Sequence, residues 1–142
     1  MAFLASQVGA LSSREWNRAV EDIGIDSRGA MLLWNVALGE GRSQRELATA
    51  LHLPGSRIVE MADMLQGRGL LERRMREGDR RTRELHVSPE GLKMVARIME
   101  VGAAHEERFA AGLKPEERRA LARLLSKLAA SRGLISTMHP GF

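Results

Sequence analysis

Apolar residues recur at helical spacing along most of this 142-residue chain, and one short stretch of alternating residues interrupts them. A first helix is predicted over about residues 3–22, ending at the break Gly24-Ile25-Asp26. Asp26 or Ser27 can cap a second helix by accepting a hydrogen bond from a free amide of its first turn. That helix carries an apolar series and stops at Gly39-Glu40-Gly41. The first part of the chain is therefore predicted to be two helices.

Two short helices joined by a tight turn are predicted next. Ser43 and Glu46 have the spacing of a capping box, in which the hydroxyl serves the amide of Glu46 and the carboxylate reaches back to the amide of Ser43. Leu53-Pro54-Gly55 ends this helix before a second one over about residues 54–66, whose apolar residues lie on one face. The pair is a candidate helix-turn-helix.

Alternating residues after Gly67-Arg68-Gly69 predict two short strands, over about residues 70–75 and 84–87. Glu77-Gly78-Asp79 supplies turn residues between them, and a turn-forming side chain is the role expected of Asp79. Ser88-Pro89-Glu90 then begins a long helix with a capping serine, a proline in the first turn and an acid near the positive helix end. This helix is expected to run to about residue 107.

The last predicted helix begins near Lys114-Pro115-Glu116 and carries a stripe of leucines on an otherwise charged sequence. Together with apolar residues near the N-terminus, these side chains are too numerous for a lone surface helix, and a two-fold interface would bury them. We therefore predict a homodimer that uses Phe3, Leu4, Val8, Leu121, Leu124, Leu125 and Leu128.

Composition narrows the classes of function. A hydrophobic content of 44% suffices for one core, so a single domain over residues 1–142 is expected. No leader pattern or long apolar run is present, and we expect a soluble, cytoplasmic protein without a membrane partner. The absence of cysteine excludes disulfides, thiolate metal sites and thiol redox sensing. Metal sensing stays open only through the donor group His105, Glu106 and Glu107, and no cofactor is indicated.

Positive charge is concentrated in one segment. The net charge of the chain is +4. The segment from Arg68 to Arg83 contains seven arginines and three acidic residues, so its net charge is also +4. Such a stretch is typical of a nucleic-acid contact, because each neutralised phosphate releases counterions. The alternative is a solvated, charge-rich hairpin. The chain has no nucleophile elbow, paired-histidine zinc motif or phosphate-binding glycine loop, so the sequence does not indicate an enzyme.

Four runs resemble the multiple antibiotic resistance regulator (MarR) family in their order and spacing. They are Ser43–Ala48 (SQRELA), Met64–Arg73 (MLQGRGLLER), Asp79–Arg81 (DRR) and Ser88–Gly91 (SPEG). The order of predicted elements matches the family along nearly the whole chain.

The resemblance implies a mainly α fold with a two-stranded β wing. Residues 26–88 would form a winged helix-turn-helix, residues 89–107 a connecting helix, and residues 1–25 and 105–142 the dimerisation helices. It also implies a triangular homodimer that binds a pseudo-palindromic operator in double-stranded DNA and represses transcription, with activation as the alternative. A small molecule bound between the dimerisation helices and the DNA-binding lobe would relieve this repression. The alternative is a winged helix used for protein contacts, which has no need for seven arginines around the ribbon.

In such a fold the helix over residues 54–66 would enter the major groove, with Ser56 and Arg57 nearest the base edges. Arginine can contact guanine with two hydrogen bonds, whereas the alternative is that Arg57 touches only phosphate. Ser43 and Gln44, at the positive end of the preceding helix, would offer amides and side chains to a phosphate. Their alternative role is capping alone.

The wing arginines would divide between groove and backbone. Arg80 and Arg81 would reach into or along the minor groove, where a narrow A·T-rich stretch strengthens the negative potential. We expect contacts with phosphate or with acidic neighbours for Arg73, Arg74 and Arg83. The resemblance also implies that Asp63 pairs with Arg81 and fixes the angle of the wing.

Both tryptophans fall on helices that line the effector cavity of the family. Trp16 and Trp34 are candidate walls of that cavity, with core packing as the alternative. Arg14 and Arg18 flank Trp16 and are candidates to receive a carboxylate or phenolate, unless they are ordinary surface residues. Since no thiol is available, we expect an aromatic or amphipathic effector.

Overall fold

The computed structural model describes residues 1–134, without the side chain of residue 80. The predicted C-terminal dimerisation segment runs to residue 142, so its last part, residues 135–142, lies outside the described residues. The elements are α1 (Ala2–Asp22), α2 (Ser27–Leu38), β1 (Arg42–Ser43), α3 (Gln44–Leu51), α4 (Gly55–Gly67), β2 (Leu71–Arg76), β3 (Asp79–Val87), α5 (Pro89–Phe109) and α6 (Pro115–Ser131). In the part of the chain that the structure describes, no helix combines the length and the apolar content needed to cross a membrane.

Side-chain caps begin three of these helices as the sequence predicts. Asp26 caps α2 by accepting a hydrogen bond from the amide of Gly29 at 2.7 Å. Ser43 and Glu46 form the expected capping box of α3. Ser88 caps α5, accepting from the amide of Gly91 at 2.9 Å. These interactions join residues three positions apart, so the spacing in the sequence was enough to predict them.

The sheet has three strands in the order β1-β3-β2, all antiparallel, whereas the sequence predicted two. β1 is only two residues long, and Ser43 in it lies opposite Glu84 of β3. A strand of that length leaves no alternating pattern to read. β3 begins at Asp79, five residues earlier than predicted, because Asp79 still pairs with Arg76 of β2. The carboxylate of Asp79 accepts hydrogen bonds from the amide of Arg81 and the hydroxyl of Thr82. The turn-forming role expected of Asp79 is therefore what the structure shows.

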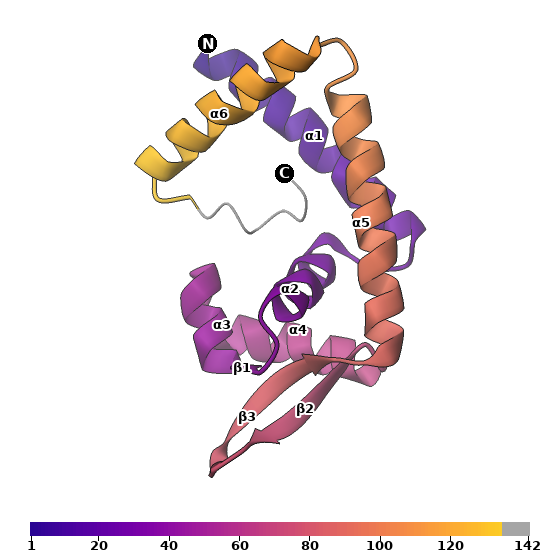
Figure 1. Cartoon of the computed structure of the whole chain (residues 1–142), viewed down its shortest axis with the longest axis vertical. Coiled ribbons are helices and arrows are strands. Elements are labelled where there is room, and N and C mark those ends of the chain that lie inside the picture. The colour runs from indigo at the N-terminus through magenta and orange to yellow at the C-terminus, as the bar shows by residue number, and fades with distance from the viewer. Residues whose placement is uncertain (135–142) are drawn as a thin grey trace.

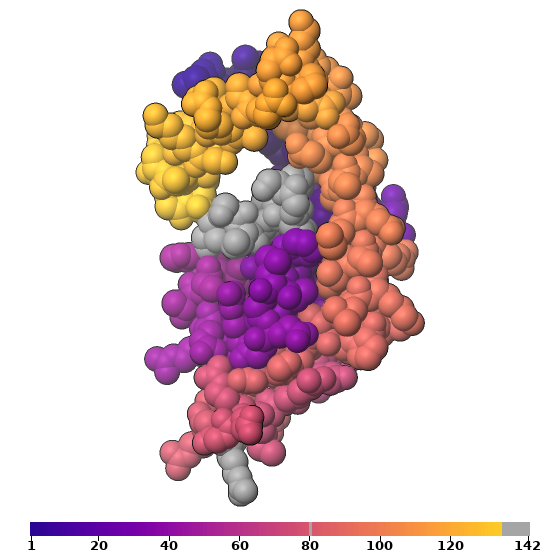
Figure 2. All heavy atoms as spheres, viewed as in Figure 1, coloured from indigo at the N-terminus to yellow at the C-terminus, as the bar shows by residue number. Residues whose placement is uncertain are grey.

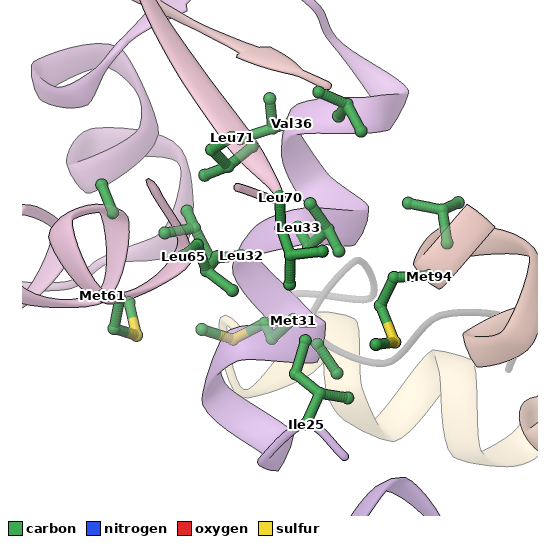
Figure 3. Close-up of a cluster of buried hydrophobic side chains, with 14 of the residues drawn as sticks. Ile25, Met31, Leu32, Leu33, Val36, Met61, Leu65, Leu70, Leu71 and Met94 are labelled. Carbon is green, nitrogen blue, oxygen red and sulfur yellow. The ribbon is translucent and has the colours of Figure 1, made fainter. Parts of the chain in front are cut away.

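The core lies where α2 meets α4, the sheet and α5. Figure 3 shows side chains of α2 facing those of α4, β2 and α5. Its largest fully buried aliphatic residues are Leu32, Leu33, Leu47, Leu51, Ile58, Leu65, Leu71, Leu85, Ile98, Val20 and Val36. Burying a side chain of this kind contributes roughly 1.5–3 kcal/mol. The core therefore fixes α3 and α4 relative to the sheet.

Gly91 allows α5 to approach the start of β2. A Cβ atom at this position would lie 2.0 Å from the carbonyl oxygen of Leu70 and 2.8 Å from Val87. The neighbour is backbone, which cannot move aside as a flexible side chain can. The glycine of the SPEG run is therefore required by packing between α5 and the ribbon.

The two ends of the molecule differ in burial. The β2–β3 ribbon lies at one end, α6 and the N-terminal half of α1 lie at the other, and α5 connects them (Figure 1). No described residue of α6 is buried. In the space-filling view the atoms of α6 gather at the end opposite the β2–β3 ribbon (Figure 2). We call residues 26–88 the winged lobe, and α1 together with α6 the helical end.

Candidate nucleic-acid interface

The N-terminus of α4 is open to solvent. Its N-cap is Pro54, which makes no side-chain cap, and Ser56 and Arg57 are exposed in its first turn. Arg57 pairs with Glu60 at 3.2 Å, and the two side chains are 46% and 71% exposed. Ion pairs at this exposure contribute little, so Arg57 can leave Glu60 for a base or a phosphate. The exposure of both side chains is compatible with the predicted recognition helix, and their contact with DNA stays a prediction.

Ser43 is occupied by capping. Its amide donates to the carboxylate of Glu46 at 2.6 Å, and its hydroxyl accepts from the amide of Glu46 at 3.2 Å. The residue is also buried, so the capping role is the one that its contacts support. Gln44 is half-buried, and its Nε2 has no hydrogen-bond partner among the described atoms. The atom is buried, so an acceptor outside the chain would reach it only if the side chain changed its conformation.

The arginines of the ribbon fall into two groups. Arg81 and Arg83 are exposed and take part in none of the ion pairs between described residues. Arg74 is exposed and pairs with Glu72 at 2.9 Å. An acidic neighbour was one of the two partners predicted for Arg74, and phosphate was the other. Arg80 lies in β3, but its side chain is outside the described part of the structure.

Asp63 pairs with Arg73 and not with Arg81. Its carboxylate lies 2.5 Å from Nη2 of Arg73, whose Nη1 donates to Gln66 of the same helix at 2.5 Å. The register explains the difference. Arg73 lies opposite Leu85, close to α4, whereas Arg81 lies four residues farther toward the turn, about 13 Å along the strand. Asp63 does link α4 to the wing, but through the base of the ribbon.

Arg76 is a residue whose role the sequence analysis missed. Its Nε donates to Glu84 of β3 at 2.6 Å, and its Nη2 donates to Glu46 of α3 at 2.8 Å and to the carbonyl of Gly41 at 3.3 Å. These partners lie eight, 30 and 35 residues away in the chain. No local pattern marks such contacts, so the sequence identified Arg76 only as one of the seven arginines between residues 68 and 83.

The contacts of Arg76 change the acidity of its partners. The backbone amide of Ser43 and the guanidinium of Arg76 lower the pKa of Glu46 from 4.5 to about 2. A hydrogen bond from Arg76 likewise holds the pKa of Glu84 below its usual value, and burial opposes this effect. The pKa of Arg76 itself is raised by the same two carboxylates. All three groups are charged at neutral pH.

The four candidate effector residues lie in different surroundings. Trp16 is 4% exposed and belongs to the core, with its ring centroid 6.0 Å from that of His105. Trp34 is half-buried and packs against the core, whereas Arg14 and Arg18 are exposed on α1. Core packing, the alternative for the tryptophans, is what the structure shows of Trp16. The single chain thus does not bring the four side chains together in one described site.

The histidine-acid group does not converge. His105 is buried against α1, where its Nε2 lies 3.1 Å from the hydroxyl of Ser12, and burial lowers its pKa. Glu107 points to α6 and pairs with Arg118 at 3.1 Å. Within residues 1–134 no group of three histidine, cysteine or acidic residues is placed to hold a metal ion.

Comparisons with known proteins find a family model, a curated relative and solved structures that resemble this chain. The MarR family model matches residues 23–82. A protein of Thauera aromatica, named for transcriptional regulation of the hcr operon, is 35% identical over 97 residues, which are 68% of this chain and 58% of that relative. The chain therefore spans little more than half the length of this curated relative.

Solved structures extend the match to most of the chain. The transcriptional repressor CouR, bound to a 23-mer DNA duplex, superposes with a TM-score of 0.81 at 27% identity, over 91% of this chain and 92% of that one. A mutant MarR from E. coli complexed with operator DNA gives a TM-score of 0.78 at 20% identity, over 89% and 91% of the two chains, and shows the same fold.

Proposed function

Because the chain belongs to the MarR family, we propose that it is a transcription regulator that binds duplex DNA through its winged lobe. The observation that carries the proposal is the joint exposure of Arg57 at the open N-terminus of α4 and of Arg81 and Arg83 on β3. A helix N-terminus and unpaired arginines both favour contact with phosphates and base edges. The proposal implies a cytoplasmic location, since DNA is the partner.

The recognition helix and the wing would have separate tasks in this complex. Arg57 and Ser56 would face base edges in the major groove, and Gln44 would meet the backbone beside them. Arg81, with Arg80, would lie along the minor groove, and Arg83 would meet phosphate. As a homodimer the protein would bind two half-sites related by a two-fold axis, so the operator would be pseudo-palindromic.

Selection from a random duplex library tests the proposal. We expect recovered sequences to share an inverted repeat with half-sites about one helical turn apart. Binding to the recovered duplex should weaken steeply with salt, because phosphate contacts release counterions. Recovery of no common sequence, together with affinity that salt does not change, would contradict the proposal and favour a protein-binding winged helix.

We further propose that the regulator is a repressor, released by a small aromatic or amphipathic molecule. The absence of cysteine excludes release by thiol oxidation, and the exposed Arg14 and Arg18 favour an anionic ligand. The dimer would complete the site beside the half-buried Trp34. Such a ligand shifts the DNA-competent population only through its preference for one arrangement of the two winged lobes.

Tryptophan fluorescence and DNA competition test this second proposal together. Substituted benzoates should change the fluorescence and release the recovered duplex over the same concentration range. A reporter gene placed behind the recovered sequence should be expressed less when the regulator is present. If benzoates change neither signal while peroxide or a divalent metal releases the duplex, the aromatic-ligand proposal is wrong.

A further inference from the structure

Two ion pairs join the wing to the helix-turn-helix within the described residues, one to each of its helices. Arg73 binds Asp63 of α4 near the base of the ribbon, and Arg76 binds Glu46 of α3 at the last residue of β2. The register of the ribbon shifts between Met75 and Arg76. Irregularities of this kind commonly redirect a side chain. Arg76 thus lies where the wing can be fixed against α3.

The contacts of Arg76 reach three separate segments at once. Its guanidinium binds Glu84 on the neighbouring strand, Glu46 in the first turn of α3 and the carbonyl of Gly41 before β1. The side chain is 34% exposed and that of Glu84 is 18% exposed, so water screens this pair less than a surface pair. Both carboxylates are ionised at neutral pH, as their lowered pKa values require. The charge of Arg76 is therefore already matched inside the chain.

We propose that Arg76 is a positioning residue that sets the wing against the N-terminus of α3, and that it is not itself a phosphate contact. This inference rests on the proposed DNA binding. The carboxylate oxygen of Glu46 that receives Arg76 also receives the amide of Ser43. One bridge thus connects the ribbon that carries Arg81 to the helix end that carries Gln44. A wing released from this bridge would present Arg81 over a range of angles, at a cost in DNA affinity.

Glu84→Gln gives a test in which the two interpretations predict opposite signs. The substitution removes a negative charge from the winged lobe, which by electrostatics alone should tighten binding to DNA. If Glu84 holds Arg76, binding should instead weaken, by about 3- to 10-fold, the size expected of coupled neighbouring groups. Glu72→Gln is the matched control, because Glu72 is an acid on the same ribbon that pairs only with the exposed Arg74. It should bind DNA as well as the wild type or slightly better.

Arg76→Lys separates geometry from charge. A lysine keeps the positive charge, but its ammonium lacks the planar fork by which arginine bonds two carboxylates in fixed directions. We expect Arg76→Lys to lose nearly as much affinity as Arg76→Ala. Affinity close to wild type for the lysine variant, or unchanged or tighter binding by Glu84→Gln, would overturn the proposal.

Hydrogen exchange of the free protein keeps this test independent of DNA. Amides of β2, β3 and the first turn of α3 should exchange faster in Glu84→Gln than in the wild type, while those of α5 stay unchanged. Equal exchange throughout would also overturn the role of Arg76. If the wild type bound no duplex at all, the proposed function would fail, and the exchange data would still decide whether Arg76 positions the wing. Far-UV circular dichroism verifies that each variant is folded.

Discussion

The winged lobe and the helical end bury their apolar residues to very different extents. In the winged lobe Leu32, Leu33 and Ile58 are 0% exposed. At the helical end Phe3 is 74% exposed and Leu128 is 54% exposed. Within the described residues a single chain therefore completes the core of the winged lobe but leaves apolar faces of α1 and α6 exposed. The comparison supports the predicted homodimer, in which a second copy would cover the exposed apolar faces of the helical end.

The largest expected effect comes from charging the uncovered leucines. Replacing Leu124 and Leu128 together by Glu should raise the dissociation constant of the dimer about 1000-fold, because a two-fold interface would bury four unpaired carboxylates. Light scattering over a dilution series measures this change. Leu38→Glu, at a leucine that is 58% exposed in the winged lobe, is the control and should leave the dimer intact. A wild-type chain that stays monomeric at micromolar concentration would refute the dimer and the paired half-sites.

Truncation of a core leucine should destabilise the fold of the single chain and not act through the dimer. Leu33→Ala is expected to lower the free energy of unfolding by about 3 kcal/mol, through lost burial and a cavity. This loss should be the same at every protein concentration, whereas the loss from Leu128→Ala should depend on concentration because it acts through the dimer. Thermal unfolding at several concentrations checks both. Concentration-independent losses from both variants would show that the helical end is stabilised within one chain.

Base recognition should depend on the winged lobe alone. Arg57→Ala is expected to reduce the preference for one base pair in each half-site by about 2 kcal/mol, without changing the dimer. Affinities for the recovered duplex and for single-substituted duplexes measure this preference. An equal loss of affinity for recovered and scrambled duplexes would show that Arg57 contacts only the backbone.

The wing should affect affinity more than preference. Replacing Arg80 and Arg81 by Ala is expected to weaken binding to all duplexes and to reduce the salt slope by at most about two phosphate contacts. A titration of affinity against salt concentration measures the slope. A selective loss at one base pair would instead assign direct readout to the wing.

The smallest expected effect is an acid dependence within the winged lobe. The pKa of Glu46 is lowered to about 2 in the folded chain, against an ordinary value of 4.5. Its contribution to stability is therefore complete above pH 4.5 and is lost as the pH falls toward 2. Unfolding measured between pH 5 and pH 2 should show a shallower loss in Glu46→Gln than in the wild type. Parallel curves would mean that the bonds of Glu46 to Ser43 and Arg76 add no stability.

Local spacing made several parts of the fold predictable. The caps formed by Asp26, Ser43 and Ser88 join groups three residues apart, and the helices they start follow the apolar pattern. The ribbon and its turn were recognisable because alternation and turn residues are also local. Arg57 and Arg81 were predicted to contact DNA, and both are exposed, since a helix terminus and a ribbon near its turn face solvent.

Local patterns in the sequence were sufficient to predict the succession of elements, the family resemblance and the concentration of arginine on the ribbon. They could not predict which arginines keep their charge available, because ion pairing depends on residues that the fold brings together from distant positions. Arg73 meets Asp63 across the base of the ribbon, and Arg76 meets Glu46 and Glu84, whereas Arg81 stays exposed. β1 and the requirement for glycine at position 91 were not predictable for the same reason, because each depends on the close approach of another segment. Periodicity describes how a chain folds on itself locally, and it carries no information on which distant charges will meet.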